Sequence, residues 1–435
     1  MRRARRLAAA LVSLAAAAAA LAQDAAEPAG VRRARDELPR LQRRLEDLRG
    51  ARFRRDVALG GGTVEELRAY LRRELDEDLP PAWSARQSRL LQALGLLPRG
   101  HDLRREVEAA LTAAVAAYYD ARQGTFFLLA PDPPASLLIH ELQHALQDQR
   151  FGLAALVAPL RGPDADPDAG LAFRLLAEGE AFYVEQRFTA EERAAPPGEL
   201  ERRLAAFAGT PRRERERQDR ARAQGDPAWL AAIDARARLP DLVYQELHAP
   251  YFQGAAAVSA LLAQGGWARI DRLFRELPAS TEQLLHPDKA PGGPAHDPPT
   301  RVALPDLSAE LGPGWSLLAT TTLGELHLRT LFEALEGQPR PGAGGGWDGD
   351  QVQAYARAGD DDGWPALAWF LVFDAPLDAQ AFARALREAQ PRAPPPLATA
   401  EVTVRGVHVL VVGGVPAERR EAVRAAARAR VRLGE

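Results

Sequence analysis

The side chains best suited to chemistry lie in the stretch HELQH, at residues 140–144. On an α-helix, His140 and His144 would share one face, with their Cβ atoms about 5–6 Å apart. Their imidazole nitrogens could then bind one Zn²⁺ ion through bonds of about 2.0–2.1 Å. Glu141 lies off that line and could instead take a proton from a metal-bound water and later pass it to the leaving group. The stretch therefore predicts two metal ligands and the general base of a zinc hydrolase.

The residues around this motif predict a buried helix, which Pro133 and Pro134 could open. Six apolar residues flank or interrupt the motif: Leu137, Leu138, Ile139, Leu142, Ala145 and Leu146. Burying a polar group without a partner costs roughly 2–7 kcal/mol, so two histidines and a glutamate in such a helix need partners. A chance match to the motif is the alternative, and the apolar helical setting favours a metal.

A catalytic zinc site needs a third protein ligand and an open position for water. The segment RLLAEGEAFYVEQRF, at residues 174–188, predicts a second helix with two candidate carboxylates. Glu178 and Glu180 each share a helical face with apolar residues, so the periodicity alone does not separate them. The alternative is that both are solvated glutamates on a surface helix.

Several motifs occur in an order that resembles the gluzincin zinc peptidases, in which a glutamate on a following helix is the third ligand. The AEGEA stretch is similar to the NEGFA segment of gluzincin aminopeptidases. The likeness is closer to a largely uncharacterised set of small, gluzincin-like predicted metallopeptidases of bacteria and archaea. Those show a YYD hairpin, HExxHALQDQ, an EG(E/D)A helix and a STEQ-LHP segment. This chain has the corresponding residues at 118–120, 140–149, 178–181 and 280–287.

This resemblance covers about residues 53–340, and more loosely the rest of the chain. It implies one zinc ion per chain, held by His140, His144 and Glu178, with Glu141 as base and then acid. The chain departs from the thermolysin-like and aminopeptidase patterns in the wider gap between His144 and Glu178. We expect residues 158–170 to form a surface loop there, since lengthening a loop costs little. The departure leaves Glu180 open as the alternative ligand.

Peptide hydrolysis develops an oxyanion, so a hydrogen-bond donor besides the metal is expected. The candidates are His286, Tyr251 and His248, each of which could instead have a structural role. Asp148, one turn past His144, could orient a ligand histidine or could cap the helix end. The strand expected at 125–129 could hold an extended substrate by β-augmentation, or could belong to an ordinary hairpin.

The N-terminus predicts a signal peptide over residues 1–22. Four arginines precede an apolar run from Leu7 to Leu21, and Ala20-Leu21-Ala22 resembles a cleavage site. The run of about 15 residues is short for roughly 30 Å of hydrocarbon, so an uncleaved anchor is the less favoured alternative. We expect a mature chain that begins at Gln23, is exported to the periplasm, cell surface or medium, and has no membrane contact.

Composition places the chain among ordinary soluble globular proteins. Its 435 residues are 46 % hydrophobic and 26 % charged, with a net charge of −3 that gives no reason to expect nucleic acid. The chain has no cysteine, so disulfides and lipid attachment through a thiol are excluded. Nothing in the sequence indicates an oligomeric state.

Element patterns predict an α+β fold. We expect a helical segment at 23–52 and then a mainly helical, zincin-like metallopeptidase domain at 53–340 with a small β-hairpin or sheet. A small α+β domain should follow at 348–435. Its strands are expected at 351–356, 364–373 and 401–412, and its helices at 377–389 and 417–431.

These observations predict an exported zinc-dependent metallopeptidase whose partner is a peptide or protein substrate. One alternative is a non-catalytic binding protein in which the metal serves as a staple, although the motif is unbroken. Another is a zinc hydrolase of cell-wall amide bonds, although the sequence has no recognisable wall-binding repeat.

Overall fold

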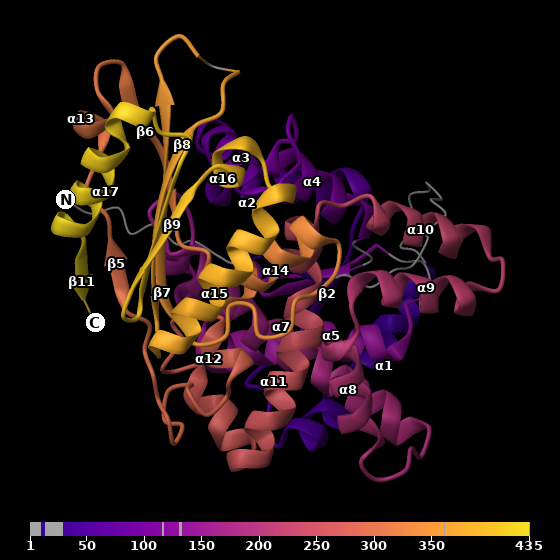
Figure 1. Ribbon diagram of the computed structural model, residues 1–435. Coiled ribbons are helices and arrows are strands. Elements are labelled where there is room, and N and C mark those ends of the chain that lie inside the picture. Colours follow the sequence, from indigo (N-terminus) through magenta and orange to yellow (C-terminus); the bar gives the residue numbers. More distant parts are fainter. Residues whose placement is uncertain (1–9, 14–28, 115–116, 130–132, 361, 435) are drawn as a thin grey trace, which may run out of the picture.

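Helices form one side of the molecule, and a five-stranded sheet with its covering helices forms the other (Figure 1). The structure is a computed structural model that describes residues 10–13, 29–114, 117–129, 133–360 and 362–434. The fold is α+β, as the sequence predicts. The expected signal segment at 1–22 lies outside the described residues except for Ala10–Ser13. Among the described residues, no helix is both long enough and apolar enough to cross a membrane.

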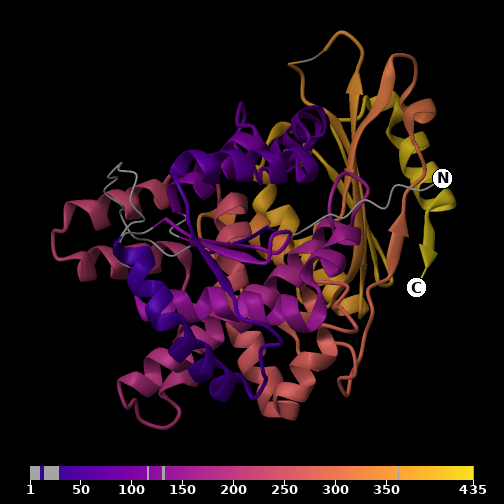
Figure 2. The same ribbon diagram turned by 180° about the vertical axis from the view of Figure 1, so that it is seen from behind.

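Four helices build the core of the helical side. Helix α5 (Ala135–Phe151) packs along α7 (Pro167–Glu192), and α7 packs along the long helix α11 (Asp241–Leu273). Helix α1 (Ala29–Arg49) is the helix expected in the 23–52 segment. It packs against α5, as the view from behind shows (Figure 2). Its buried face carries apolar side chains at helical spacing, as packing on a core requires.

Ten further helices surround this core or, like α3, α13 and α14, pack against the second sheet. They are α2 (Val64–Asp78), α3 (Pro81–Leu94), α4 (Leu103–Ala114), α6 (Leu153–Val157), α8 (Glu199–Gly209), α9 (Arg212–Ala223), α10 (Pro227–Ala237), α12 (Glu282–Leu285), α13 (Ser308–Leu311) and α14 (Gly324–Glu336). Thr63 and Glu66 form a capping box at the start of α2, in which each side chain accepts from the other residue's backbone N–H.

A small sheet lies beside α5, with the strand order β1-β3-β4-β2. The strands are β1 (Ala10–Ser13), β2 (Ala58–Gly61), β3 (Ala117–Asp120) and β4 (Thr125–Leu128). Strands β3 and β4 form the expected hairpin. Of the two roles left open for residues 125–129, the ordinary hairpin agrees with the structure, because β4 pairs with β3 on one side and with β2 on the other and so has no free edge for a substrate.

The second sheet is antiparallel, with the strand order β6-β7-β8-β10-β9. Its strands are β6 (Trp315–Thr321), β7 (Trp347–Arg357), β8 (Ala366–Phe373), β9 (Glu401–Arg405) and β10 (His408–Gly413). All of β8 is buried, because alternate residues meet helices on opposite faces. Leu367, Trp369, Leu371 and Phe373 share a core with α3, α14 and α15 (Pro376–Ala389). Ala366, Ala368, Phe370 and Val372 share another with α13 and α17 (Arg420–Arg430).

This sheet begins before the boundary that the sequence suggests at 340–348. Strand β6 pairs with β7, although its residues lie in the range assigned to the preceding domain. The buried carboxylate of Asp350 accepts hydrogen bonds from the backbone N–H groups of Leu323 and Gly324, so it ties the start of α14 to the sheet. Three short elements complete this side: β5 (Arg301–Ala303), α16 (Pro395–Ala398) and β11 (Arg432–Gly434), which pairs with β5.

Candidate metal centre

Helix α5 presents His140 and His144 to the interior as neighbours on one face. Their ring centroids lie 4.9 Å apart and the rings are close to perpendicular. Their exposed fractions are 1 % and 0 %, and α5 is buried on nearly every side. The prediction of a buried, apolar helix around the motif is therefore confirmed.

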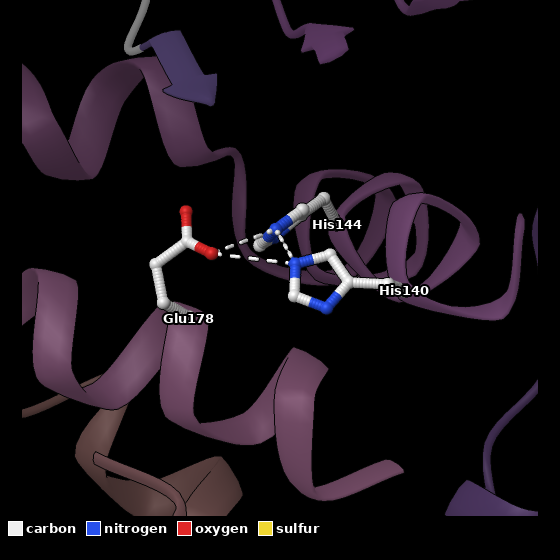
Figure 3. A group of neighbouring side chains, drawn as sticks. All are labelled: His140, His144 and Glu178. Carbon is white, nitrogen blue, oxygen red and sulfur yellow. Dashed lines mark hydrogen bonds and ion pairs between the residues drawn. The ribbon is translucent and has the colours of Figure 1, made fainter. Parts of the chain in front are cut away.

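Glu178 of α7 meets both histidines (Figure 3). Its Oε2 atom lies 3.3 Å from Nε2 of His140 and 3.4 Å from Nε2 of His144. The two Nε2 atoms lie 3.2 Å from each other. Only 4 % of Glu178 is exposed. Three potential ligand atoms thus converge on one buried point, where they could hold a metal ion.

Glu180, the alternative ligand, points to a different neighbourhood. Its carboxylate accepts a hydrogen bond from Nε2 of Gln147 at 2.8 Å and another from Nε of Arg49. Residues two positions apart on a helix do not face the same way, so only one of the two glutamates can meet the histidines. The structure brings Glu178 to them and Glu180 to Arg49.

Two glycines determine which face of α7 lies against α11. A Cβ atom built on Gly179 would lie 2.3 Å from the backbone carbonyl carbon of Gly254 on α11. A Cβ on Gly254 would lie 2.3 Å from the backbone oxygen of Leu175. The two helices therefore cross in direct backbone contact, and Gly179 sits between Glu178 and Glu180 because no side chain fits there.

The outer nitrogens of the two imidazoles also have partners. Nδ1 of His140 lies 3.2 Å from Oε2 of Glu185, and Nδ1 of His144 lies 3.0 Å from Oε1 of Gln147. Metal-bound histidines usually have such partners, which orient the ring. The sequence analysis did not predict Glu185 or Gln147 as partners of the histidines. Only spacing could have indicated them, since Gln147 follows His144 by three residues and Glu185 follows Glu178 by seven, in each case on one helical face.

Asp148 does not orient a histidine through any contact that the described residues show. Its carboxylate accepts the hydroxyl of Tyr119 at 3.1 Å and the backbone N–H of Leu153 at 3.1 Å. Of the two roles that the sequence left open for Asp148, the structure supports the capping of the end of α5. The YYD segment contributes here, because its second tyrosine is the partner.

The three central side chains hold a proton between them at neutral pH. Burial lowers the pKa of His140, but hydrogen bonds to Glu178 and Glu185 outweigh this and raise it to about 10. Burial raises the pKa of Glu178, but His144 and His140 outweigh this and lower it to about 2. At neutral pH the point where the ligand atoms meet therefore holds a proton, which a metal cation would have to displace.

We therefore expect a divalent metal ion that binds here to release about one proton per chain at pH 7, since His140 is protonated below its pKa of about 10 and must be neutral to bind metal. The apparent affinity for the ion should rise about tenfold per pH unit from pH 6 to 9, because one proton competes with it. Calorimetric titration in two buffers of different ionisation enthalpy counts the proton. Binding without proton release would contradict this charge state.

Glu141 and Tyr251, two of the predicted catalytic residues, lie next to His140, the first in sequence and the second in space. Glu141 directly follows His140 and is 0 % exposed. The ring of Tyr251, on α11, stacks on the ring of His140 with centroids 5.8 Å apart. Phe182 meets the edge of the same tyrosine at 5.9 Å. Tyr251 is thus placed beside one candidate ligand, and Glu141 is buried in the helix that carries both histidines.

His286 and His248 have other recorded partners. Nε2 of His286 lies 3.0 Å from the buried carboxylate of Glu325 on α14, and its side chain is 42 % exposed. Nδ1 of His248 donates to the backbone oxygen of Tyr244 at 2.8 Å. Burial, together with nearby arginines, lowers the pKa of His248 to about 3, so this ring is neutral. Among the described contacts, none joins either histidine to the three candidate ligands.

The STEQLLHP segment forms a structural junction. The backbone N–H and the hydroxyl of Thr281 both donate to Asp168, at 3.0 and 2.7 Å, which ties α12 to the first turn of α7. Asp168 lies in the insert expected at 158–170 as a surface loop. That expectation is wrong in part, because α7 already begins at Pro167 and Asp168 is buried.

Two cavities of about 610 Å³ each lie near this core. One is bordered by α11, α12 and α14 and includes His248 and Phe252 in its wall. The other lies where α3, α9 and α14 meet. His140, His144 and Glu178 line neither of them. The candidate centre thus lies within the packed helices, apart from both cavities.

Comparison with known proteins identifies a relationship only for the sheet. A family described as a domain of unknown function, DUF8575, matches residues 316–424. This range runs from β6 into α17, so it coincides with the five-stranded sheet and its covering helices. The matched range does not include the candidate metal centre. No curated protein and no solved structure matched the chain.

Proposed function

We propose that this chain is an exported zinc-dependent metallopeptidase, with His140, His144 and Glu178 as the ligands. The observation that carries the proposal is the spacing of their ligand atoms, which is 3.2, 3.3 and 3.4 Å. Around a tetrahedral zinc ion with bonds of about 2.0–2.1 Å, neighbouring ligand atoms lie about 3.3–3.4 Å apart. Two nitrogens and one carboxylate oxygen are also a donor set that zinc accepts at catalytic sites.

The helical part is, in this proposal, a zincin-like domain of the gluzincin kind. Two ligands come from one helix, and the third comes from a later helix that packs against it. Export rests on the N-terminal pattern of arginines, apolar residues and a small-residue site. Cleavage after Ala22 would also remove β1 from its place beside β3.

Bound zinc supplies Lewis acidity, which makes water a usable nucleophile near neutral pH. Glu141 takes the proton of the attacking water on a carboxylate oxygen and delivers it to the leaving nitrogen of the peptide. Tyr251 is the better placed of the oxyanion donors, because it stacks on His140. His286, at 42 % exposure and paired with Glu325, would have to leave that partner to act.

Metal content and hydrolysis test this proposal together. Mature protein, expected to begin at Gln23 by N-terminal sequencing after export from a bacterial host, should contain about one zinc per chain. It should cleave members of a broad peptide pool, lose this activity after chelation and regain it with zinc. A wild-type protein that binds no zinc would reject the proposal. Purified peptidoglycan, digested in parallel, tests the cell-wall alternative.

A second candidate is a non-catalytic protein in which the metal staples α5 to α7. The observation that favours it is burial, because no candidate ligand is more than 4 % exposed and none lines either cavity. Structural zinc sites are closed and contribute folding free energy. In that case chelation should lower the unfolding temperature strongly, while the zinc-loaded protein cleaves neither the peptide pool nor peptidoglycan.

A further inference from the structure

A chain of buried contacts leads from His144 away from the proposed metal to the N-terminal helix. His144 meets the Gln147 side-chain amide, and this amide meets Glu180 on α7. The Glu180 carboxylate in turn accepts from Arg49, the last residue of α1. Arg49 also donates to Asp271 of α11 at 2.5 Å. Four helices are thus joined behind one candidate ligand.

The contacts of Gln147 determine which way its amide points. Its Nε2 atom donates to the backbone oxygen of Ala177 at 2.9 Å and to Glu180 at 2.8 Å. Both neighbours can only accept, so the NH₂ group must lie on this side and the amide oxygen must face His144. An oxygen at that place accepts a hydrogen from Nδ1 of His144. The lone pair of the imidazole is then on Nε2, the atom that faces Glu178.

The Glu180 carboxylate holds the Gln147 amide in this orientation through their hydrogen bond. The Arg49 guanidinium forms the ion pair that compensates the burial of this carboxylate. The side chains of Arg49 and Glu180 are 1 % and 0 % exposed, so neither charge is solvated. A buried carboxylate without a cation would be strongly disfavoured. The Arg49 guanidinium is itself held over the ring of Trp267, 4.2 Å from its centroid. Helix α1 thus supplies the cation that pairs with the buried Glu180 carboxylate.

We propose that Glu180 and Arg49 are positioning residues, which act through Gln147 to hold His144 in the tautomer that leaves Nε2 free for the metal. The helix at 29–49 is then part of the metal-binding unit, although it contributes no ligand. This inference rests on the proposed function and concerns how the same site is prepared.

Zinc affinity of full-length mature variants, measured by competition with a chelator of known affinity, tests the chain of contacts. Gln147→Leu and Glu180→Gln should each weaken zinc binding by about 10–100-fold, as loss of outer partners of a ligand histidine usually does. Arg49→Lys should weaken it less, because an ammonium keeps the charge but cannot bond Glu180 and Asp271 with one planar group. The matched control is Asp148→Asn, next to Gln147, which should leave zinc affinity unchanged.

A second measurement needs no zinc, and the wild type alone can decide it. In zinc-free wild type with ¹⁵N-labelled histidine, long-range ¹H–¹⁵N spectra at pH 8 should show His144 with its hydrogen on Nδ1. Gln147→Leu should shift His144 to a mixture of tautomers. A predominantly Nε2-protonated His144 in wild type would overturn the inference, even if a variant failed to fold.

The outcomes separate this inference from the proposed function. Variants at 147 and 180 that bind zinc as tightly as wild type would overturn the positioning role and leave the metallopeptidase proposal intact. An Arg49→Lys variant with unchanged affinity would overturn the part assigned to α1. Absence of zinc binding by wild type rejects the proposed function. The tautomer of His144 then still tests whether Gln147, Glu180 and Arg49 orient this histidine.

Discussion

Glu141→Gln should lower kcat/KM for peptide hydrolysis by about 10²–10⁴-fold while zinc remains bound, because a general base contributes rate enhancement of that size. Glutamine has the shape of glutamate but cannot accept and return a proton. Shape matters here, since Glu141 is 0 % exposed within the packed helix α5. The zinc ligands proposed above do not include Glu141, so the metal should stay at about one ion per chain.

The measurement combines hydrolysis of a peptide found in the pool digest with zinc analysis of the same sample. Glu333→Gln is a matched control, because Glu333 is also a buried helical glutamate, and its recorded hydrogen-bonding partner is Gln245. This control should keep both activity and zinc. A fully active Glu141→Gln variant would reject the proposed base, and loss of zinc from it would indicate a structural role instead.

Glu178→Gln should have the second-largest effect and weaken zinc binding by more than about 100-fold, beyond the range typical for outer partners. The change replaces the anionic ligand by a neutral amide of the same shape, and the ion then faces two neutral imidazoles. Hydrolysis should fall with zinc occupancy and recover in part at high zinc concentration. Chelator competition and activity against added zinc measure both quantities.

The informative comparison is Glu180→Gln, the same change two residues further along α7. The structure predicts a smaller loss of affinity for it, because Glu180 contacts Gln147 and Arg49 rather than the histidines. If Glu180→Gln abolished zinc binding and Glu178→Gln did not, the assignment of the third ligand would be reversed. Equal and small effects would show that neither carboxylate binds the ion.

Local patterns in the sequence were sufficient to predict the helices that carry the candidate metal centre. The spacing of His140 and His144 predicts a shared helical face, because the pitch of a helix depends only on neighbouring residues. The β3–β4 hairpin was also predicted, because a turn between two short strands depends on neighbouring residues. The buried character of α5 follows from an apolar run that extends around the whole helix.

The choice among partners was decided by tertiary structure alone. Glu178 and Glu180 have equivalent helical surroundings in the sequence, and only the crossing of α7 and α11 at Gly179 and Gly254 determines which one meets the histidines. The same holds for β4, whose second neighbour β2 lies more than sixty residues away along the chain.

The residues that contact the candidate ligands from behind show most clearly what the sequence could not predict. Asp148 is one turn past His144 and has the right chemistry, yet it caps the helix end, and Gln147 makes the contact instead. Arg49 reaches this network from a helix that ends about ninety residues before His140. Periodicity indicates which side chains leave a helix together. What they meet depends on how distant helices pack, and that is a property of the whole fold.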